Sequence, residues 1–159
     1  MSDELSLPAA RLSTLQLSEV IGDELEGVIF EEINLNQTTM TEKKGAIEKA
    51  SFELAVKVVN AMKVLVEEKR EYVLSKQLLR SGTAVGALVR EAQNAESDRD
   101  FIHKLAIAQK ECDESIYWID LLVATDYLTE LQTAEIRSQA ASILRMIKSA
   151  ILTVKKRLK

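Results

Sequence analysis

The chain is poor in the residues that interrupt helices or build sheets. Its 159 residues include one proline, five glycines and only 4% aromatics. Strand-rich domains use more turn residues and more aromatics, so this composition favours an all-α fold. The single cysteine, Cys112, excludes an intramolecular disulfide and is typical of a reducing compartment. No apolar run approaches the roughly 18 residues of a membrane span, and no signal peptide is recognisable. We therefore expect a soluble, cytoplasmic protein with no membrane association.

The sequence also lacks the residues of a catalytic or metal centre. Its one histidine, His103, follows Asp100 by three positions, whereas a di-metal site in a helical bundle needs two Glu-x-x-His pairs. We interpret His103 as a partly exposed helix residue and Cys112 as a buried structural thiol. Gly82 and Gly86 lie inside a helical run, so they do not form a phosphate-binding loop. No catalytic residue, metal ligand or cofactor is predicted, and we do not expect an enzyme.

The net charge of −4 is unevenly distributed. Residues 1–44 carry nine acids and three bases, and residues 45–159 carry sixteen acids and eighteen bases. The chain is therefore expected to divide into an acidic leader (1–44) and a mildly basic body (45–159). Apolar residues from Leu17 to Ile29 follow helical spacing, although two glycines interrupt them. Two interpretations of the leader remain open: a flexible segment, or an apolar-faced segment that docks on a partner or a neighbouring subunit.

Four long apolar stripes at helical spacing occupy the body. They predict helices at residues 41–69, 72–94, 97–126 and from 129 to the C-terminus, with a short polar break at residues 67–71. Thr41, Ser97 and Thr129 are the expected N-caps, and Gln132 is placed to complete a capping box with Thr129. The fourth stripe is predicted to begin at Leu131. Short connections force neighbouring helices to be antiparallel, so the predicted fold is an up-down-up-down four-helix bundle.

Gly82 and Gly86 stand four residues apart inside the second predicted helix, so they share one helix face. A glycine in a helix interior costs about 1 kcal/mol relative to alanine. The usual compensation is that another helix can approach more closely. We interpret the pair as a close-packing face, and a ligand or nucleic-acid groove is the alternative.

Other side chains are candidates for contacts outside the protomer. Tyr117 and Trp118 are adjacent on one helix and point about 100° apart, so a single core can hardly take both. At least one is expected at a subunit boundary, where tyrosine and tryptophan are enriched. Exposed bases could instead contact nucleic acid, although a solvated face that complements the helix dipole also explains them. These bases are Lys76, Arg80, Arg90, Lys155, Lys156 and Arg157.

Three segments of the body have a specific order and spacing: SFELAVKVVNAMKVL (51–65), YVLSKQLLRSGTAVGALVREAQNAES (72–97) and DFIHKLAIAQKECDESIYWIDLL (100–122). They closely resemble the bacterial four helix bundle protein family. That family includes proteins encoded in 23S ribosomal RNA intervening sequences, and it is related to accessory variability proteins of diversity-generating retroelements. The resemblance covers about Ala46 to Lys156. It implies a homopentamer of four-helix protomers around a central channel, and no established enzymatic activity.

The chain departs from that family at two positions of the glycine-containing stretch. Where members usually carry serine and asparagine, it has Ala84 and Leu88. We therefore expect Leu88 to join Tyr117 and Trp118 at a subunit interface. The sequence favours a non-enzymatic, homopentameric scaffold or adaptor that recruits a protein partner through residues 1–40. One alternative is an RNA-binding accessory protein of a retroelement or intervening sequence, although the body lacks the strong positive charge of such relatives. Another is an engineered oligomer with an appended N-terminal peptide.

Overall fold

The computed structural model describes residues 28, 29, 31 and 45–158. The chain divides into two units, Met1–Met40 and Thr41–Lys159. In the first unit, Val28 and Ile29 are helical with exposed side chains. The rest of the helically spaced stretch from Leu17 to Ile29, and the predicted N-cap Thr41, lie outside the described residues. The second unit is described from residue 45 onward.

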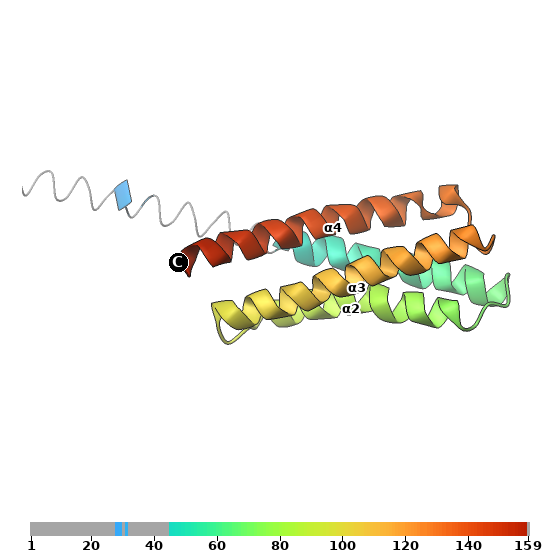
Figure 1. Cartoon of the computed structure of the whole chain (residues 1–159), viewed down its shortest axis with the longest axis horizontal. Helices are drawn as coiled ribbons and strands as arrows, with labels where there is room; N and C mark the ends of the chain where they lie inside the picture. The colour runs from blue at the N-terminus through green and yellow to red at the C-terminus, as the bar shows by residue number, and fades with distance from the viewer. Residues whose placement is uncertain (1–27, 30, 32–44, 159) are drawn as a thin grey trace, which may run out of the picture. The chain divides into compact units, whose positions relative to one another are not determined.

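Residues 45–158 form four helices and no strand. The first is described over residues 45–67. It is followed by α2 (Leu74–Gln93), α3 (Asp98–Ala124) and α4 (Glu130–Arg157), as Figure 1 shows. The ends that the sequence predicts within this range lie within two residues of the observed ends. The all-α fold is confirmed.

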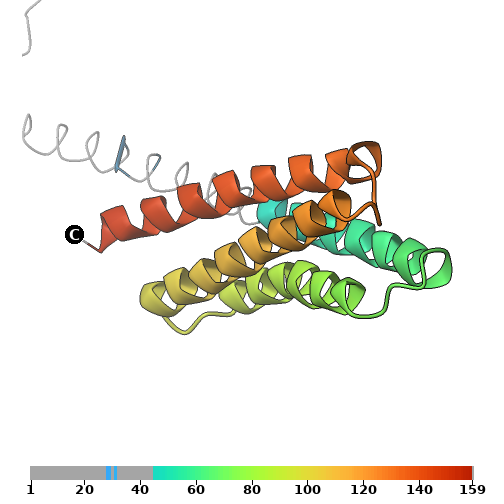
Figure 2. The ribbon, with the colours of Figure 1, turned by 45° about the vertical axis from the view of Figure 1, so that its right-hand side comes forward.

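The four helices follow one another around the bundle. Helix α3 contacts both α2 and α4, while α2 and α4 share no close contact. The helix of residues 45–67 meets α2 where Val58 faces Gly82, and it meets α4 through an ion pair between Lys57 and Glu135. The helix 45–67 and α3 are therefore diagonal partners, as the views in Figures 1 and 2 agree. This is the predicted antiparallel up-down-up-down bundle.

The caps of α3 and α4 follow from their first residues. The Ser97 hydroxyl accepts the Asp100 N–H at 3.1 Å. At α4, the Thr129 hydroxyl accepts the Gln132 N–H at 3.3 Å, and the Gln132 side chain accepts the Thr129 N–H at 2.9 Å. The predicted capping box is present at α4. At α3, the Asp100 carboxylate accepts the N–H of Glu96, the residue before the N-cap, at 3.2 Å.

Helix α2 begins differently, because its cap comes from the connection before it. Glu71 is only 7% exposed. Its carboxylate accepts backbone N–H groups of Val73, Leu74 and Ser75 at 2.9, 2.8 and 2.6 Å. Burial by itself would raise the pKa of Glu71, but these three donors and the Ser75 side chain lower it below its usual value. Residues 67–71 are thus more than a polar break, since one acid holds the N-terminus of α2.

The core follows the predicted stripes with one correction. Leu131 was expected to begin the α4 stripe, but it is 88% exposed. Five positions separate it from the buried Ile136, which places the two about 140° apart around the helix. Thr133 occupies the inward position instead, and its hydroxyl bonds the Thr129 carbonyl at 3.1 Å. On α3, Ser115 is fully buried, whereas its neighbour Ile116 is only half-buried.

Candidate functional site

The glycine pair lies where α2 meets the helix of residues 45–67. A Cβ at Gly82 would lie 2.7 Å from the Val58 Cγ2 atom, and Gly82 is itself buried. A Cβ at Gly86 would lie 3.5 Å from the Ser51 carbonyl oxygen, which is an ordinary contact. The backbones of α2 and of the helix 45–67 therefore approach each other closely at the glycine pair. At Gly82, the Val58 side chain already fills the space that a Cβ would need.

Two buried hydroxyls join α2 to α3 behind this face. Ser81 and Ser115 are both fully buried, and their Oγ atoms lie 3.1 Å apart. Ser81 also lies 3.1 Å from the Gln77 carbonyl oxygen, and Ser115 lies 2.8 Å from the Glu111 carbonyl oxygen. Each hydroxyl thus has its partners within the bundle, so this pair is a structural contact between helices.

The outer seam between α2 and α3 carries a charged and aromatic cluster. Arg80 forms an ion pair with Glu114 and lies 3.5 Å from the Glu111 carboxylate. The Trp118 Nε1 atom donates to Glu114 at 3.0 Å. The hydrogen bond from Trp118, followed by that from Arg80, lowers the pKa of Glu114. Arg80, a predicted nucleic-acid contact, is therefore engaged within the protomer.

Tyr117 extends this cluster into solvent. Its side chain is 58% exposed, and its ring packs edge-on against Trp118 with centroids 5.0 Å apart. Exposed tyrosine beside tryptophan and arginine is the composition of interface hot spots. Leu88 is half-buried on α2, eight residues after Arg80 and thus about 12 Å further along the helix. The structure brings Tyr117 and Trp118 together, and Leu88 lies apart from them.

The remaining predicted nucleic-acid contacts do not gather in one patch. Arg90 forms an ion pair with Glu48 at 3.2 Å. Lys76 is exposed in the first turn of α2, at the end of the bundle where the helix 45–67 finishes. The other three bases are exposed in the last turn of α4, at the opposite end, because α4 runs antiparallel to the helix 45–67. They are Lys155, Lys156 and Arg157.

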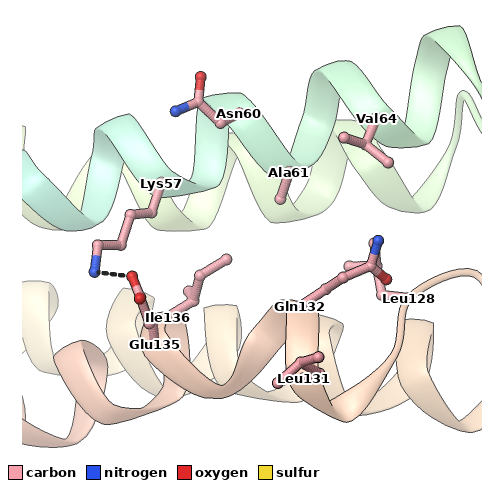
Figure 3. Close-up of a pocket in the computed structure, with 9 residues that line it drawn as sticks. All are labelled: Lys57, Asn60, Ala61, Val64, Leu128, Leu131, Gln132, Glu135 and Ile136. Carbon is pink, nitrogen blue, oxygen red and sulfur yellow. Dashed lines mark hydrogen bonds and ion pairs between the residues drawn. The ribbon is translucent and has the colours of Figure 1, made fainter.

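A groove of about 370 Å³ lies between the helix 45–67 and the start of α4 (Figure 3). The Lys57 Nζ atom and the Glu135 carboxylate meet across it at 2.9 Å. A second polar link follows further along, where the Gln139 side chain donates to the Ala50 carbonyl and the Glu53 carboxylate, both at 3.0 Å. This groove was not predicted from the sequence. It is lined by Lys57, Asn60, Ala61, Val64, Leu128, Leu131, Gln132, Glu135 and Ile136.

Cys112 and His103 differ in their exposure to solvent. Cys112 is fully buried, with its Sγ atom 3.6 Å from the Ala140 carbonyl oxygen. Burial, with a smaller contribution from Asp113, raises the pKa of its thiol to about 12. His103 is exposed on α3. Across the described residues, no three potential metal ligands come together. Nor is any helix in that part of the chain long and apolar enough to cross a membrane.

These features define a four-helix-bundle protein. Its exposed Tyr117 side chain and its groove with the Lys57–Glu135 ion pair lie on the surface of the bundle. The chain belongs to the 23S rRNA-intervening sequence protein family, whose model matches residues 43–149. Its fold is similar to that of a protein of unknown function from the S23 ribosomal protein family of Bacteroides thetaiotaomicron. The two chains are 46% identical with a TM-score of 0.67, over 69% of this chain and 97% of the other. No curated protein matches the chain significantly. The resemblance described from the sequence is confirmed.

Proposed function

We propose that the protein is a non-enzymatic scaffold or adaptor that assembles as a homo-oligomer of about five copies, as the resemblance to the family implies. The observation that carries this proposal is the exposed ring of Tyr117 on α3, which packs against the half-buried Trp118. Tyr117 is 58% exposed although it packs on Trp118, and covering it would remove a large apolar ring from water. Glu114, which is paired with Arg80, also accepts the hydrogen bond from Trp118, so the indole ring is held in place before a partner binds.

The proposal extends to the partner and the compartment. A buried free thiol suits a reducing, cytoplasmic compartment. Residues 1–40 are proposed to recruit a protein partner to the assembly, because Val28 and Ile29 present exposed apolar side chains from a strongly acidic segment.

The mass of the full-length protein in solution tests the assembly. We expect light scattering after size-exclusion chromatography to give a mass near five protomers at micromolar concentration. A monomer across that concentration range would overturn the proposal. Tyr117→Glu should shift the mass toward the monomer, because it places a charge in the proposed contact.

A second candidate function, RNA binding, is favoured by the basic last turn of α4. Lys155, Lys156 and Arg157 are exposed, and no ion pair holds them within residues 45–158. An oligomer would repeat this cluster once per copy, which multiplies weak phosphate contacts. The family description also refers to 23S rRNA. Binding to a structured RNA should therefore appear at low salt and weaken steeply as salt rises. Undetectable binding at low salt would exclude this candidate.

A further inference from the structure

We propose that the copies join head to tail, with the outer face of the helix 45–67 of one copy packed on the α3 aromatic surface of the next. This inference rests on the proposed self-association and names the second half of its interface. We call Phe52, Val56 and Val59 the Phe52 stripe, and Tyr117, Trp118 and Leu121 the Tyr117 surface.

The Phe52 stripe is an apolar helix face that its own bundle leaves uncovered. Phe52 is 60% exposed and Val56 is 44% exposed, while Val59 is half-buried. Their spacing of four and three places them on one side of the helix. The buried side of the same helix is a different one, carried by Leu54 and Val58. The helix 45–67 thus has two apolar faces, and packing within the protomer buries only the one that carries Leu54 and Val58.

The two surfaces point in opposite directions. The helix 45–67 and α3 are diagonal in the bundle, so their outer faces lie on opposite sides of the protomer (Figures 1 and 2). A contact between two different, oppositely placed patches is heterologous, and repeating it produces a ring or a filament. A self-complementary patch would produce only a pair. The placement of the two faces therefore suits an assembly that extends beyond a pair of copies.

Charge complementarity favours the second copy as the occupant. Lys49 and Lys63 each lie seven positions from Val56 and therefore border the Phe52 stripe on one line. Of the acids on the same side, Glu67 lies at the end of the helix, and Glu53 accepts a hydrogen bond from Gln139 of α4. Asp113 and Asp120 border Tyr117 at four positions before and three positions after it. Within the described part of the chain, Lys49, Lys63 and Asp113 form no ion pair, although Asp120 pairs with Arg137.

A Phe52 stripe placed on a second Phe52 stripe would bring lysines against lysines. Placed on the Tyr117 surface, the same lysines meet aspartates, and the nearest base on that face of α3 is Lys110, seven positions before Tyr117. The head-to-tail contact is therefore the favoured pairing of the two surfaces.

A mixing experiment with two full-length variants tests this arrangement. Phe52→Glu removes the stripe and keeps the Tyr117 surface, whereas Tyr117→Glu does the reverse. Each variant alone should be monomeric at concentrations where the wild type is assembled, with the dissociation constant raised about tenfold or more. An equimolar mixture should form a dimer of one copy of each, because one intact contact remains and no ring can close. Both side chains are exposed, so circular dichroism should show unchanged folding.

The controls separate this inference from the proposed function. Leu152→Glu changes an equally exposed apolar residue on α4, outside both surfaces, and should leave the assembly intact. Assembly of Phe52→Glu at wild-type mass, or a mixture that stays monomeric, would overturn the head-to-tail arrangement while leaving self-association standing. Loss of assembly in Leu152→Glu would contradict the specific pairing. A monomeric wild type would overturn the proposed function and this arrangement together.

Discussion

Gly82 packs directly against Val58, so closely that an added Cβ would lie only 2.7 Å from the Val58 Cγ2 atom. Valine is branched at Cβ and has one strongly preferred rotamer in a helix, so it cannot turn aside cheaply. The neighbouring Gly86 faces the Ser51 carbonyl at an ordinary 3.5 Å. Two glycines four residues apart therefore have different roles.

This difference predicts opposite effects of alanine at the two positions. Gly82→Ala overpacks a full site, at a cost of about 1–3 kcal/mol, against a gain of about 1 kcal/mol in helix propensity. We expect it to lower the free energy of unfolding by about 1 kcal/mol. Gly86→Ala should leave it unchanged or raise it by up to about 1 kcal/mol. Urea unfolding at matched protein concentration measures both. Equal losses in the two variants would contradict the geometry.

The Glu71 cap predicts a specific loss of stability in acid. Because its pKa is lowered on folding, its contribution is present above the pKa of the unfolded chain and is lost as pH falls through the folded value. Glu71→Gln should destabilise the protein by about 1–2 kcal/mol at pH 7. The variant should also show a smaller loss of stability between pH 7 and pH 3.

Glu68→Gln is the matched control, since it neutralises an exposed acid in the same connection. Its unfolding curve at pH 7 should overlay that of the wild type. If Glu68→Gln and Glu71→Gln weaken the protein equally, the cap is not the cause.

The thiol of Cys112 predicts a slow reaction with disulfide reagents. Only the thiolate attacks, and a pKa of about 12 leaves very little of it at pH 8. Burial also denies access to the reagent. The native protein should therefore react with an aromatic disulfide reagent at the rate at which it unfolds, and mild urea should accelerate the reaction. Rapid labelling under native conditions would show that α3 and α4 separate easily.

The last turn of α4 predicts which residues carry any RNA binding. Replacing Lys155, Lys156 and Arg157 with alanine should weaken binding and reduce its dependence on salt, because fewer counterions are released. Arg90→Ala is the comparison, since Arg90 is engaged by Glu48 at 3.2 Å. Fluorescence anisotropy over a series of salt concentrations measures both. A larger effect of Arg90→Ala would place the RNA elsewhere on the bundle.

Helix positions and two of the caps could be predicted because their causes are local. Apolar spacing and the side chains of Ser97 and Thr129 act within one or two turns. Leu131 was wrongly assigned to the core because it is an apolar residue near the start of the helix. Its angular position around the helix axis, far from that of the buried Ile136, shows that it does not belong to the apolar stripe. The burial of Glu71 was missed although its donors lie only two to four residues further along the chain, because residues 67–71 were interpreted as a polar break.

The candidate surfaces could be predicted only as single residues. The adjacency of Tyr117 and Trp118 is visible in the sequence, and so is the four-residue spacing of the glycines. The capture of Arg80 by Glu114 is not, because these residues are 34 positions apart and meet only when α2 and α3 pack in register. The uncovered Phe52 face was also missed, because the buried stripe through Leu54 and Val58 could be predicted, but the sequence does not show that a second apolar face of the same helix stays exposed.

The helix 45–67 is held to its two neighbours by unlike contacts. On the α2 side, its Val58 side chain packs closely against Gly82. On the α4 side, the ion pair between Lys57 and Glu135 spans a groove. In the proposed assembly, the tilt of this helix relative to α3 would set the angle between the two joining faces, and that angle would determine how many copies complete a ring. If the proposed assembly is correct, filling the groove, for example with Ala61→Leu, should therefore alter the number of subunits without changing the proposed contact surfaces.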